Sequence, residues 1–298
     1  MTGFRKGVLY AAFAYICWGF LPLYWHLLSF TSPLHILGCR IVFSLVFTVL
    51  PLIAIKNKTW IQLLSKNGKS TVAASLALAF NWGLYIWAVN TGHTMDASLG
   101  YYMNPLVSIL LGLIFLKEKL TPLQWTAFGL AVFGVILKTL FSGVFPVMAV
   151  LLALSFGFYG LLKKKNKAGS MESLGAETLA ALPIGLAFLL LPPSDIPQLI
   201  SLSPLRWILL ASCGIITAVP LLAFSQGAKF LPLATVGFLQ FINPTILFFL
   251  GVFVFGETFS IRDLWAFIFI WAAMILYCLS LNPSHSGKCL PLNGNHLE

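Results

Sequence analysis

The sequence predicts an all-α integral membrane protein with ten transmembrane helices, arranged as two inverted repeats of five helices each. Three observations support this: the composition, ten long apolar runs and an internal repeat. The 298 residues are 59% hydrophobic and only 9% charged, with a mean hydropathy of +0.93. Because a soluble surface is about 25–35% charged, this composition excludes a soluble enzyme, a disordered protein, a coiled coil and a nucleic-acid-binding domain.

A helix needs about 20 mainly apolar residues to cross the hydrocarbon core of a bilayer. No soluble domain fits between the apolar runs, because the longest polar stretches lie near 56–70 and after 282. The first run follows Arg5 and Lys6 but exceeds the apolar region of a signal peptide, about 7–15 residues, so we expect a retained helix. The ten expected spans are 7–27, 33–55, 71–90, 97–116, 122–141, 144–162, 173–192, 206–226, 233–255 and 262–282.

The placement of Lys and Arg predicts the orientation. With the amino terminus inside, fourteen Lys and Arg residues fall in inner segments and three in outer segments. Cytoplasmic loops carry such an excess, so both termini are expected in the cytoplasm. The net charge of +10 is then explained by the Lys and Arg residues of the cytoplasmic loops. We interpret the run Lys163-Lys164-Lys165-Asn166-Lys167 as an anchor at anionic lipid headgroups rather than a nucleic-acid patch.

Two stretches, 98–137 and 237–276, align without gaps at an offset of 139 residues. Residues 1–141 and 142–282 are therefore expected to be two copies of one unit, followed by a cytoplasmic tail, 283–298. Because five spans are an odd number, the second copy starts on the opposite side of the membrane. Secondary transporters commonly use such inverted repeats, with substrate sites near the midplane. The alignment matches Asn104-Pro105 with Asn243-Pro244, Gly112 with Gly251, and Glu118 with Glu257.

These motifs resemble the EamA-type carriers of the drug/metabolite transporter superfamily. The whole chain is similar to the RarD group, through Lys6-Gly7-Val8, Trp18-Gly19 and Ala176-Glu177-Thr178. One departure is the turn Leu116-Lys117-Glu118, where members of the family often have Leu-Gly-Glu. The resemblance implies a permease, favoured as an exporter, that moves a small organic metabolite or drug across the cell inner membrane, driven by a proton gradient. It names no substrate.

Each half places an Asn-Pro pair well inside a span. Pro105 and Pro244 remove a backbone hydrogen bond and free a carbonyl four residues back, and such groups are tolerated where they meet protein or a water-filled cavity. One interpretation is a central substrate site formed by Tyr101, Asn104, Gln240 and Asn243. The other is that these amides bond neighbouring helices and the prolines only kink them.

Further candidates lie in the other spans. Asn81, Tyr85, Trp18 and Tyr159 could stack on or bind a planar or cationic solute, or they could serve packing alone. The intramembrane charge of Arg40 suggests a site for an anionic group, unless its side chain extends outward to the membrane surface.

Four acidic residues and one histidine complete the set of candidates. Glu177 is a candidate coupling residue that gains and loses a proton, unless it caps a helix start. Glu118 and Glu257 are expected to cap the next helix or hold a hairpin. His93 and Asp96 form either a proton relay at the outer mouth or a solvated loop pair.

No cofactor, metal or enzymatic activity is expected. The Gly68-Lys69-Ser70 core lacks the earlier glycine of a phosphate-binding loop, since Leu63 occupies that place, and the five His are scattered. None of the five Cys residues forms a C-x-x-C motif. The expected partners are therefore a small solute, the bilayer and protons, and not nucleic acid. Two alternatives remain open: a non-transporting partner or sensor subunit, and a membrane-embedded enzyme acting on lipid.

Overall fold

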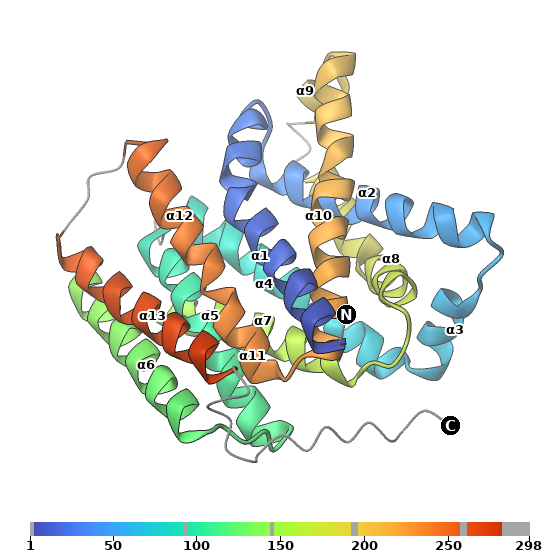
Figure 1. Ribbon diagram of the computed structural model, residues 1–298. Helices are drawn as coiled ribbons and strands as arrows, with labels where there is room; N and C mark the ends of the chain where they lie inside the picture. Colours follow the sequence, from blue (N-terminus) through green and yellow to red (C-terminus); the bar gives the residue numbers. More distant parts are fainter. Residues whose placement is uncertain (1–2, 92–93, 144–145, 192–195, 257–260, 282–298) are drawn as a thin grey trace.

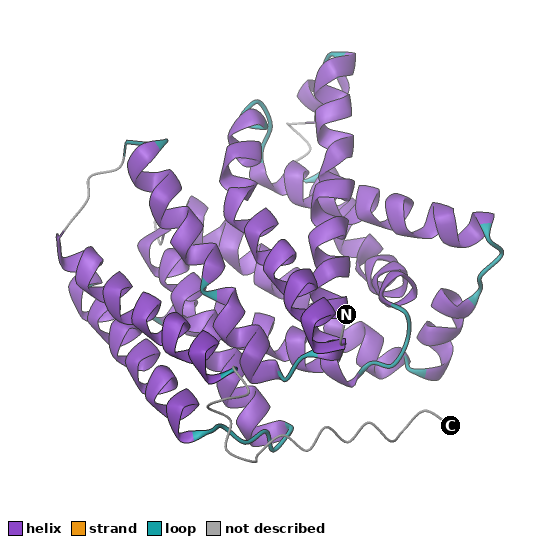
Figure 2. Ribbon diagram, viewed as in Figure 1, coloured by secondary structure: helices purple, strands orange, loops and turns teal. Residues whose placement is uncertain are grey.

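The computed structural model describes residues 3–91, 94–143, 146–191, 196–256 and 261–281, and every regular element in these ranges is a helix (Figures 1 and 2). The helices are α1 Gly3–Leu27, α2 Pro33–Ala54, α3 Thr59–Lys66, α4 Gly68–Asn90, α5 Thr94–Phe115, α6 Pro122–Ser142, α7 Val147–Lys165, α8 Ser170–Leu190, α9 Ile196–Ile200, α10 Pro204–Phe230, α11 Leu233–Gln240, α12 Ile242–Phe253 and α13 Ile261–Ser280.

The described residues contain nine helical segments long and apolar enough to cross a membrane, with α11 and α12 together forming one of them. A shorter apolar stretch, Leu264–Ser280, lies in α13. The chain is therefore a multi-pass membrane protein. Two short helices, α3 and α9, were not expected from the sequence. In α3, Trp60 and Leu63 are buried although the segment is polar overall, so a one-sided apolar face holds this helix against the bundle.

The spans pack as a closely spaced bundle in which α1 contacts α10, α2 contacts α8, α5 contacts α7, and α6 contacts α13. Small residues permit this spacing, as is usual between membrane helices. A Cβ atom on Gly134 of α6 would lie 2.9 Å from the carbonyl oxygen of Ala266 in α13. A Cβ on Gly38 of α2 would lie 2.8 Å from the carbonyl oxygen of Gly185 in α8.

The two Asn-Pro segments differ in backbone but pack against each other. Helix α5 continues through Pro105, whereas the chain breaks at Phe241, between α11 and α12, just before Asn243-Pro244. A Cβ on Gly237 of α11 would lie 2.7 Å from the carbonyl oxygen of Pro105. Ser108 also donates a hydrogen bond of 3.3 Å to Oε1 of Gln240. The repeated motif of each half therefore contacts the other half.

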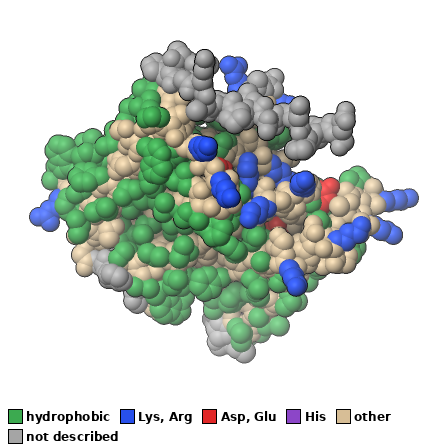
Figure 3. All heavy atoms as spheres, turned by 90° about the horizontal axis from the view of Figure 1, so that it is seen from below, with side chains coloured by type: hydrophobic (Ala, Val, Ile, Leu, Met, Phe, Trp, Pro, Cys, Tyr) green, Lys and Arg blue, Asp and Glu red, His purple; other side chains and the backbone are tan. Residues whose placement is uncertain are grey.

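The connections α2–α3, α5–α6, α7–α8 and α10–α11 lie together at one end of the bundle, which we call the basic end. Hydrogen bonds join them: Asn57 donates to Glu172, Lys229 to the carbonyl of Ala168, and Lys164 to that of Leu231. Lys and Arg side chains are spread over this end (Figure 3). Its exposed basic residues are Arg5, Lys6, Lys56, Lys58, Lys66, Lys69, Lys117, Lys119, Lys165 and Lys167.

The sequence suggested that Glu118 caps the helix that follows it or holds a hairpin. In the structure it does not cap that helix. Helix α6 has its own capping box, in which Thr121 and Gln124 bond each other's backbone. The Glu118 carboxylate instead accepts hydrogen bonds from the backbone N–H groups of Leu233 (2.6 Å) and Ala234 (2.9 Å), at the start of α11. A carboxylate is stabilised there by the free N–H groups and the helix dipole. Glu118 thus joins the α5–α6 hairpin to the second half.

The residue before Glu118 has a left-handed backbone conformation. Lys117 has a φ of +53°, and Gly256, at the equivalent position 139 residues later, has a φ of +65°. This left-handed conformation costs a residue with a side chain roughly 1–2 kcal/mol. The turn therefore favours glycine, and Lys117 holds a strained backbone.

We expect Lys117→Gly to stabilise the protein. Relief of the left-handed strain exceeds the entropy cost of glycine in the unfolded chain, which leaves a gain of about 0.5–1 kcal/mol. The measurement is the thermal unfolding of purified protein in detergent, with Gly256→Ala as the matched opposite change, which should lower the midpoint. A lower midpoint for Lys117→Gly would contradict this account.

Candidate functional site

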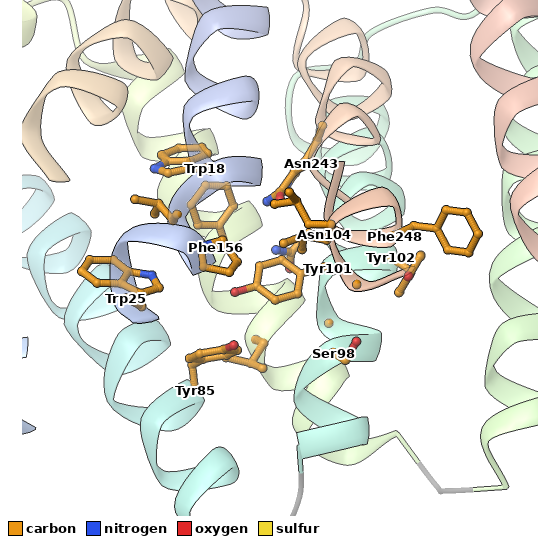
Figure 4. Close-up of a pocket in the computed structure, with 18 of the residues that line it drawn as sticks. Trp18, Trp25, Tyr85, Ser98, Tyr101, Tyr102, Asn104, Phe156, Asn243 and Phe248 are labelled. Carbon is orange, nitrogen blue, oxygen red and sulfur yellow. The ribbon is translucent and has the colours of Figure 1, made fainter. Parts of the chain in front are cut away.

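A cavity of about 440 Å³ lies inside the bundle. Its lining includes Trp18, Phe156 and Gln240, which lie near the middle of their spans. It also includes residues at the ends of α1, α4 and α12 that lie away from the basic end. Figure 4 shows Trp25 and Tyr85 on one side of it, and Asn104 and Asn243 on the other. The cavity is therefore approached from the end of the bundle opposite the basic end.

The structure brings most of the residues singled out in the sequence to this cavity. Tyr159 is the exception: it is fully buried and does not line the wall. The residues of that set that do line the cavity are Trp18, Arg40, Asn81, Tyr85, Tyr101, Asn104, Gln240 and Asn243. They come from five different spans, so no single helix could have formed the site.

Among the described residues that line the cavity, the two repeat-related asparagines carry buried polar atoms without a hydrogen-bond partner. Asn104 is 9% exposed and Asn243 is 7% exposed, and the unpartnered atom of each is Oδ1. Tyr15, His35 and Ser225 also have such atoms but do not line the cavity. A buried unpaired acceptor costs about 1–3 kcal/mol. Both Oδ1 atoms belong to side chains that line the cavity, so rotation of the side chain would bring each within reach of a solute.

Two other amides are already engaged between helices. Asn81 of α4 donates hydrogen bonds to the Leu152 carbonyl (2.9 Å) and to Ser155 Oγ (3.0 Å) on α7. The carbonyl oxygen of Gln240 accepts from Ser108. These two amides therefore bond neighbouring helices while they line the cavity. Tyr85 and Tyr101 meet edge to face, with ring centroids 5.8 Å apart, and form an aromatic part of the wall.

Arg40 lies on the cavity wall and does not extend outward to the membrane surface. Its guanidinium carbon is 4.2 Å from the ring centre of Trp82 and 4.9 Å from that of Trp25. Its Nε atom donates to Thr217 Oγ1 at 3.1 Å. Cation–π contacts of this kind are worth about 2 kcal/mol or more when desolvated, so the two indoles partly compensate a charge held at this depth.

An aromatic layer lies beneath the cavity. Trp18 and Phe156 line the cavity and contact each other edge to face at 5.6 Å. Below them Phe224 stacks on Tyr159, with ring centroids 6.0 Å apart. The Tyr159 hydroxyl donates to Oε2 of Glu177 at 3.3 Å. One tyrosine therefore connects the floor of the cavity to a buried carboxylate.

Glu177 does not cap a helix. Its Oε1 forms an ion pair of 2.8 Å with Lys163 Nζ, and the two side chains are 2% and 1% exposed. Ser173 donates to the same carboxylate oxygen at 2.7 Å and accepts from Lys163 at 2.8 Å. Ser75 of α4 donates to the backbone carbonyl of Glu177 at 2.8 Å. A buried pair persists when its remaining groups are hydrogen-bonded in this way.

The ion pair corrects the interpretation of the lysine run. Lys163 is buried and Lys164 turns to carbonyls of the α10–α11 turn, so only Lys165 and Lys167 remain exposed as headgroup anchors. The i, i+4 spacing of Tyr159 with Lys163, and of Ser173 with Glu177, was a usable signal. The sequence analysis also missed Trp25, Trp82 and Lys138 as lining residues. His93, Glu257 and the side chain of Asp96 lie outside the described residues.

The described lining is aromatic, amide-bearing and cationic. The charged residues among the described lining are Arg40 and Lys138, both cationic, so the general acid–base pairs that an enzyme needs are missing from the described lining. Within the described part of the chain, no group of His, Cys, Asp and Glu could hold a metal ion. What the lining presents is aromatic faces, amide oxygens and positive charge.

Comparisons with known proteins agree with this picture. The EamA-like transporter family matches residues 5–140 and again 145–279. The chain is 46% identical to the uncharacterized transporter YojE of Bacillus subtilis, over 93% of this chain and 94% of that protein. It is 38% identical to the protein RarD of Escherichia coli, over 92% and 94%.

A solved crystal structure superposes with a TM-score of 0.73 at 17% identity, covering 92% of this chain and 97% of the other. That likeness concerns the fold alone. The identities with the transporters, together with the two family matches, place the function more closely. The chain belongs to the EamA-like transporter family and, within it, is a RarD-type transporter.

Proposed function

We propose that this protein is a secondary transporter that moves a small organic metabolite or drug through the central cavity by alternating access. The observation that carries the proposal is the cavity itself. It lies at mid-depth, and it is lined by repeat-related Asn104 and Asn243, whose buried amide oxygens have no hydrogen-bond partner. Binding energy is then available where the two repeats meet, which is where inverted-repeat carriers bind their substrates.

The architecture is proposed as ten spans in two inverted repeats, residues 1–141 and 142–282. The two family matches support it. The helix contacts support it too: at the 139-residue offset, α2 packs on its own equivalent α8, and α6 on its equivalent α13. In such a pair the two halves rock about a shared axis, and the α2–α8 and α6–α13 contacts lie on that axis.

We place the basic end in the cytoplasm, since short inner loops carry the excess of Lys and Arg. The membrane is then the cell inner membrane, and the cavity faces outward in this conformation. The inner side is closed by Glu118 on α11 and by Lys164 and Lys229 on neighbouring carbonyls. Release of these contacts is the step that would open the cavity to the cytoplasm during export.

We further propose that Glu177 carries the coupling proton, with Lys163 as its partner. Protonation of the carboxylate leaves the Lys163 charge unpaired in a buried site, which is strongly unfavourable, so the proton state and the packing of α7 on α8 change together. Tyr159 connects this pair to the aromatic floor of the cavity. Occupation of the cavity and protonation of Glu177 are linked through that contact.

The first prediction concerns the asparagines. Asn104→Ala and Asn243→Ala should each reduce solute binding and transport by roughly five- to tenfold, the value of one hydrogen bond of about 1–1.5 kcal/mol. Binders are first sought by thermal shift among amino acids, nucleosides and amphenicols, because a ligand at about 100 times its Kd stabilises by about 2.7 kcal/mol. The strongest binder is then the transport probe in proteoliposomes.

The matched control is Asn57→Ala, which removes an amide at the basic end that bonds Glu172 away from the cavity. It should transport as the unmodified protein does. Normal transport by both Asn104→Ala and Asn243→Ala, at normal expression, would mean that the cavity is not the substrate site.

The second prediction concerns the ion pair. Lys163→Met alone should destabilise the protein by about 3–5 kcal/mol, because Glu177 is left buried without its partner. The double variant Lys163→Met with Glu177→Met should fold, since hydrophobic replacement of both partners is often neutral or stabilising. Folding is measured by thermal unfolding in detergent.

In proteoliposomes the double variant should carry the probe down its own gradient but fail to concentrate it against one when a pH gradient is imposed. The unmodified protein should do both. If the double variant still accumulates solute in response to the pH gradient, the ion pair is structural and coupling lies elsewhere.

A further inference from the structure

We propose that the cavity selects organic anions, specifically planar aromatic carboxylates that also carry a hydrogen-bond donor. This inference rests on the proposed function, because it names the solute class of the proposed transport site. Three features of the lining carry it: the sign of its charge, the geometry of Arg40, and the asparagine oxygens.

The first feature is the charge of the described part of the lining. Among the described residues around the cavity, Arg40 and Lys138 are charged and none is acidic. Elsewhere this chain gives its buried cations partners: Lys163 pairs with Glu177, and Lys164 and Lys229 donate to backbone carbonyls. Within the described part of the chain, by contrast, Arg40 has no carboxylate at ion-pair distance. An unpaired charge at membrane depth is costly and marks a functional site.

Three contacts restrain the guanidinium of Arg40. It lies over the rings of Trp25 and Trp82, and its Nε atom donates a hydrogen bond to Thr217. The remaining donors are the two terminal amino groups, which form the planar fork that matches a carboxylate bidentately. Preorganisation of this kind reduces the entropy lost on binding. The contacts therefore prepare Arg40 for a planar anionic group.

The rest of the wall defines the body of the solute. The cavity is lined by the aromatic rings of Tyr85, Tyr101 and Trp18. Such a surface suits a flat apolar ring of the solute. Asn104 and Asn243 line the cavity with buried Oδ1 atoms that have no partner. An amide oxygen accepts hydrogen bonds only, so a solute that brings an N–H or O–H group can bind these atoms once the side chains rotate toward it. A cavity of about 440 Å³ has the size of ordinary small-molecule sites and holds a bicyclic ring system with its substituents.

The test uses three probes with one shape and three charges: naphthoate, naphthamide and naphthamidine. Their affinities for the purified protein are measured by thermal shift at millimolar concentrations and by calorimetry. We expect naphthoate to bind about tenfold or more tightly than the neutral amide, because hydrogen bonds to charged groups are the stronger kind. The cationic amidine should bind weakest, since Arg40 and Lys138 repel it. A hydroxyl-bearing naphthoate should bind more tightly still, and that gain should disappear in Asn104→Ala or Asn243→Ala.

The diagnostic variant is Arg40→Met, which keeps the length of the side chain and removes its charge. It should weaken naphthoate binding by about tenfold or more and leave naphthamide binding within about twofold. Arg206→Met is the matched control, because Arg206 also lies over an aromatic ring, Phe30, at 5.0 Å but does not line the cavity. It should leave all three affinities unchanged.

A measurement without ligand separates this role from a structural one. If Arg40 is kept for an anion, Arg40→Met should unfold at the same temperature as the unmodified protein or higher. A clear loss of stability, with naphthoate still preferred, would assign Arg40 to packing and overturn the proposal.

Equal or tighter binding of naphthamide or naphthamidine would also overturn it, as would the absence of any naphthoate binding. None of these results bears on transport itself. That function is judged by whether Asn104→Ala and Asn243→Ala impair movement of the independently identified probe.

Discussion

A charge or backbone group without a hydrogen-bond or ion-pair partner costs free energy inside a bilayer. In this chain such partners are concentrated at one end of the helix bundle. At the basic end every polar element of the closure is paired. Glu118 meets the free N–H groups of α11, Lys164 meets the carbonyls at the end of α10, and Lys163 meets Glu177. In the cavity, Asn104 and Asn243 keep unpaired acceptors. The contacts at the basic end are therefore satisfied within the protein, whereas we propose that a solute satisfies the asparagines of the cavity.

Some features of the two sequence repeats recur at the 139-residue offset, and three charged residues do not. The turn geometry at Lys117 and Gly256 and the buried Asn104 and Asn243 recur at the 139-residue offset. These features shape a site that both halves can open and close. Three charged residues have no equivalent: Arg40, Lys163 and Glu177 correspond to Leu179, Tyr24 and Gly38. Because these charged residues break the repeat, the charge selection and the proton coupling that we propose would each depend on one half, while the repeated features would serve the movement of both halves.

Much of the fold could be predicted because its signals are local. Each expected span is a run of apolar residues long enough for a bilayer. Every one of these runs overlaps a helix of the described residues, with the ninth divided between α11 and α12, and nine of the helical segments there are long and apolar enough to cross a membrane. The site was accessible for a similar reason: amide side chains in the middle of apolar runs are few, and Asn81, Asn104, Gln240 and Asn243 all line the cavity. The short helices α3 and α9 escaped prediction because their segments are too short or too polar for that criterion. Tyr159 was misplaced because burial behind Trp18 and Phe156 is not visible in the sequence.

The sequence by itself determined the class of protein, the positions of the spans and the family, since composition, run length and the repeated Asn-Pro and Glu motifs are properties of the linear chain. Only the tertiary structure decided which charges are paired. In the structure Lys163 forms an ion pair with Glu177, and Glu118 binds the start of α11 rather than the helix that follows it. Arg40 lies over the rings of Trp25 and Trp82. These are contacts between different helices, which follow from how the helices cross and not from the pattern along any one of them.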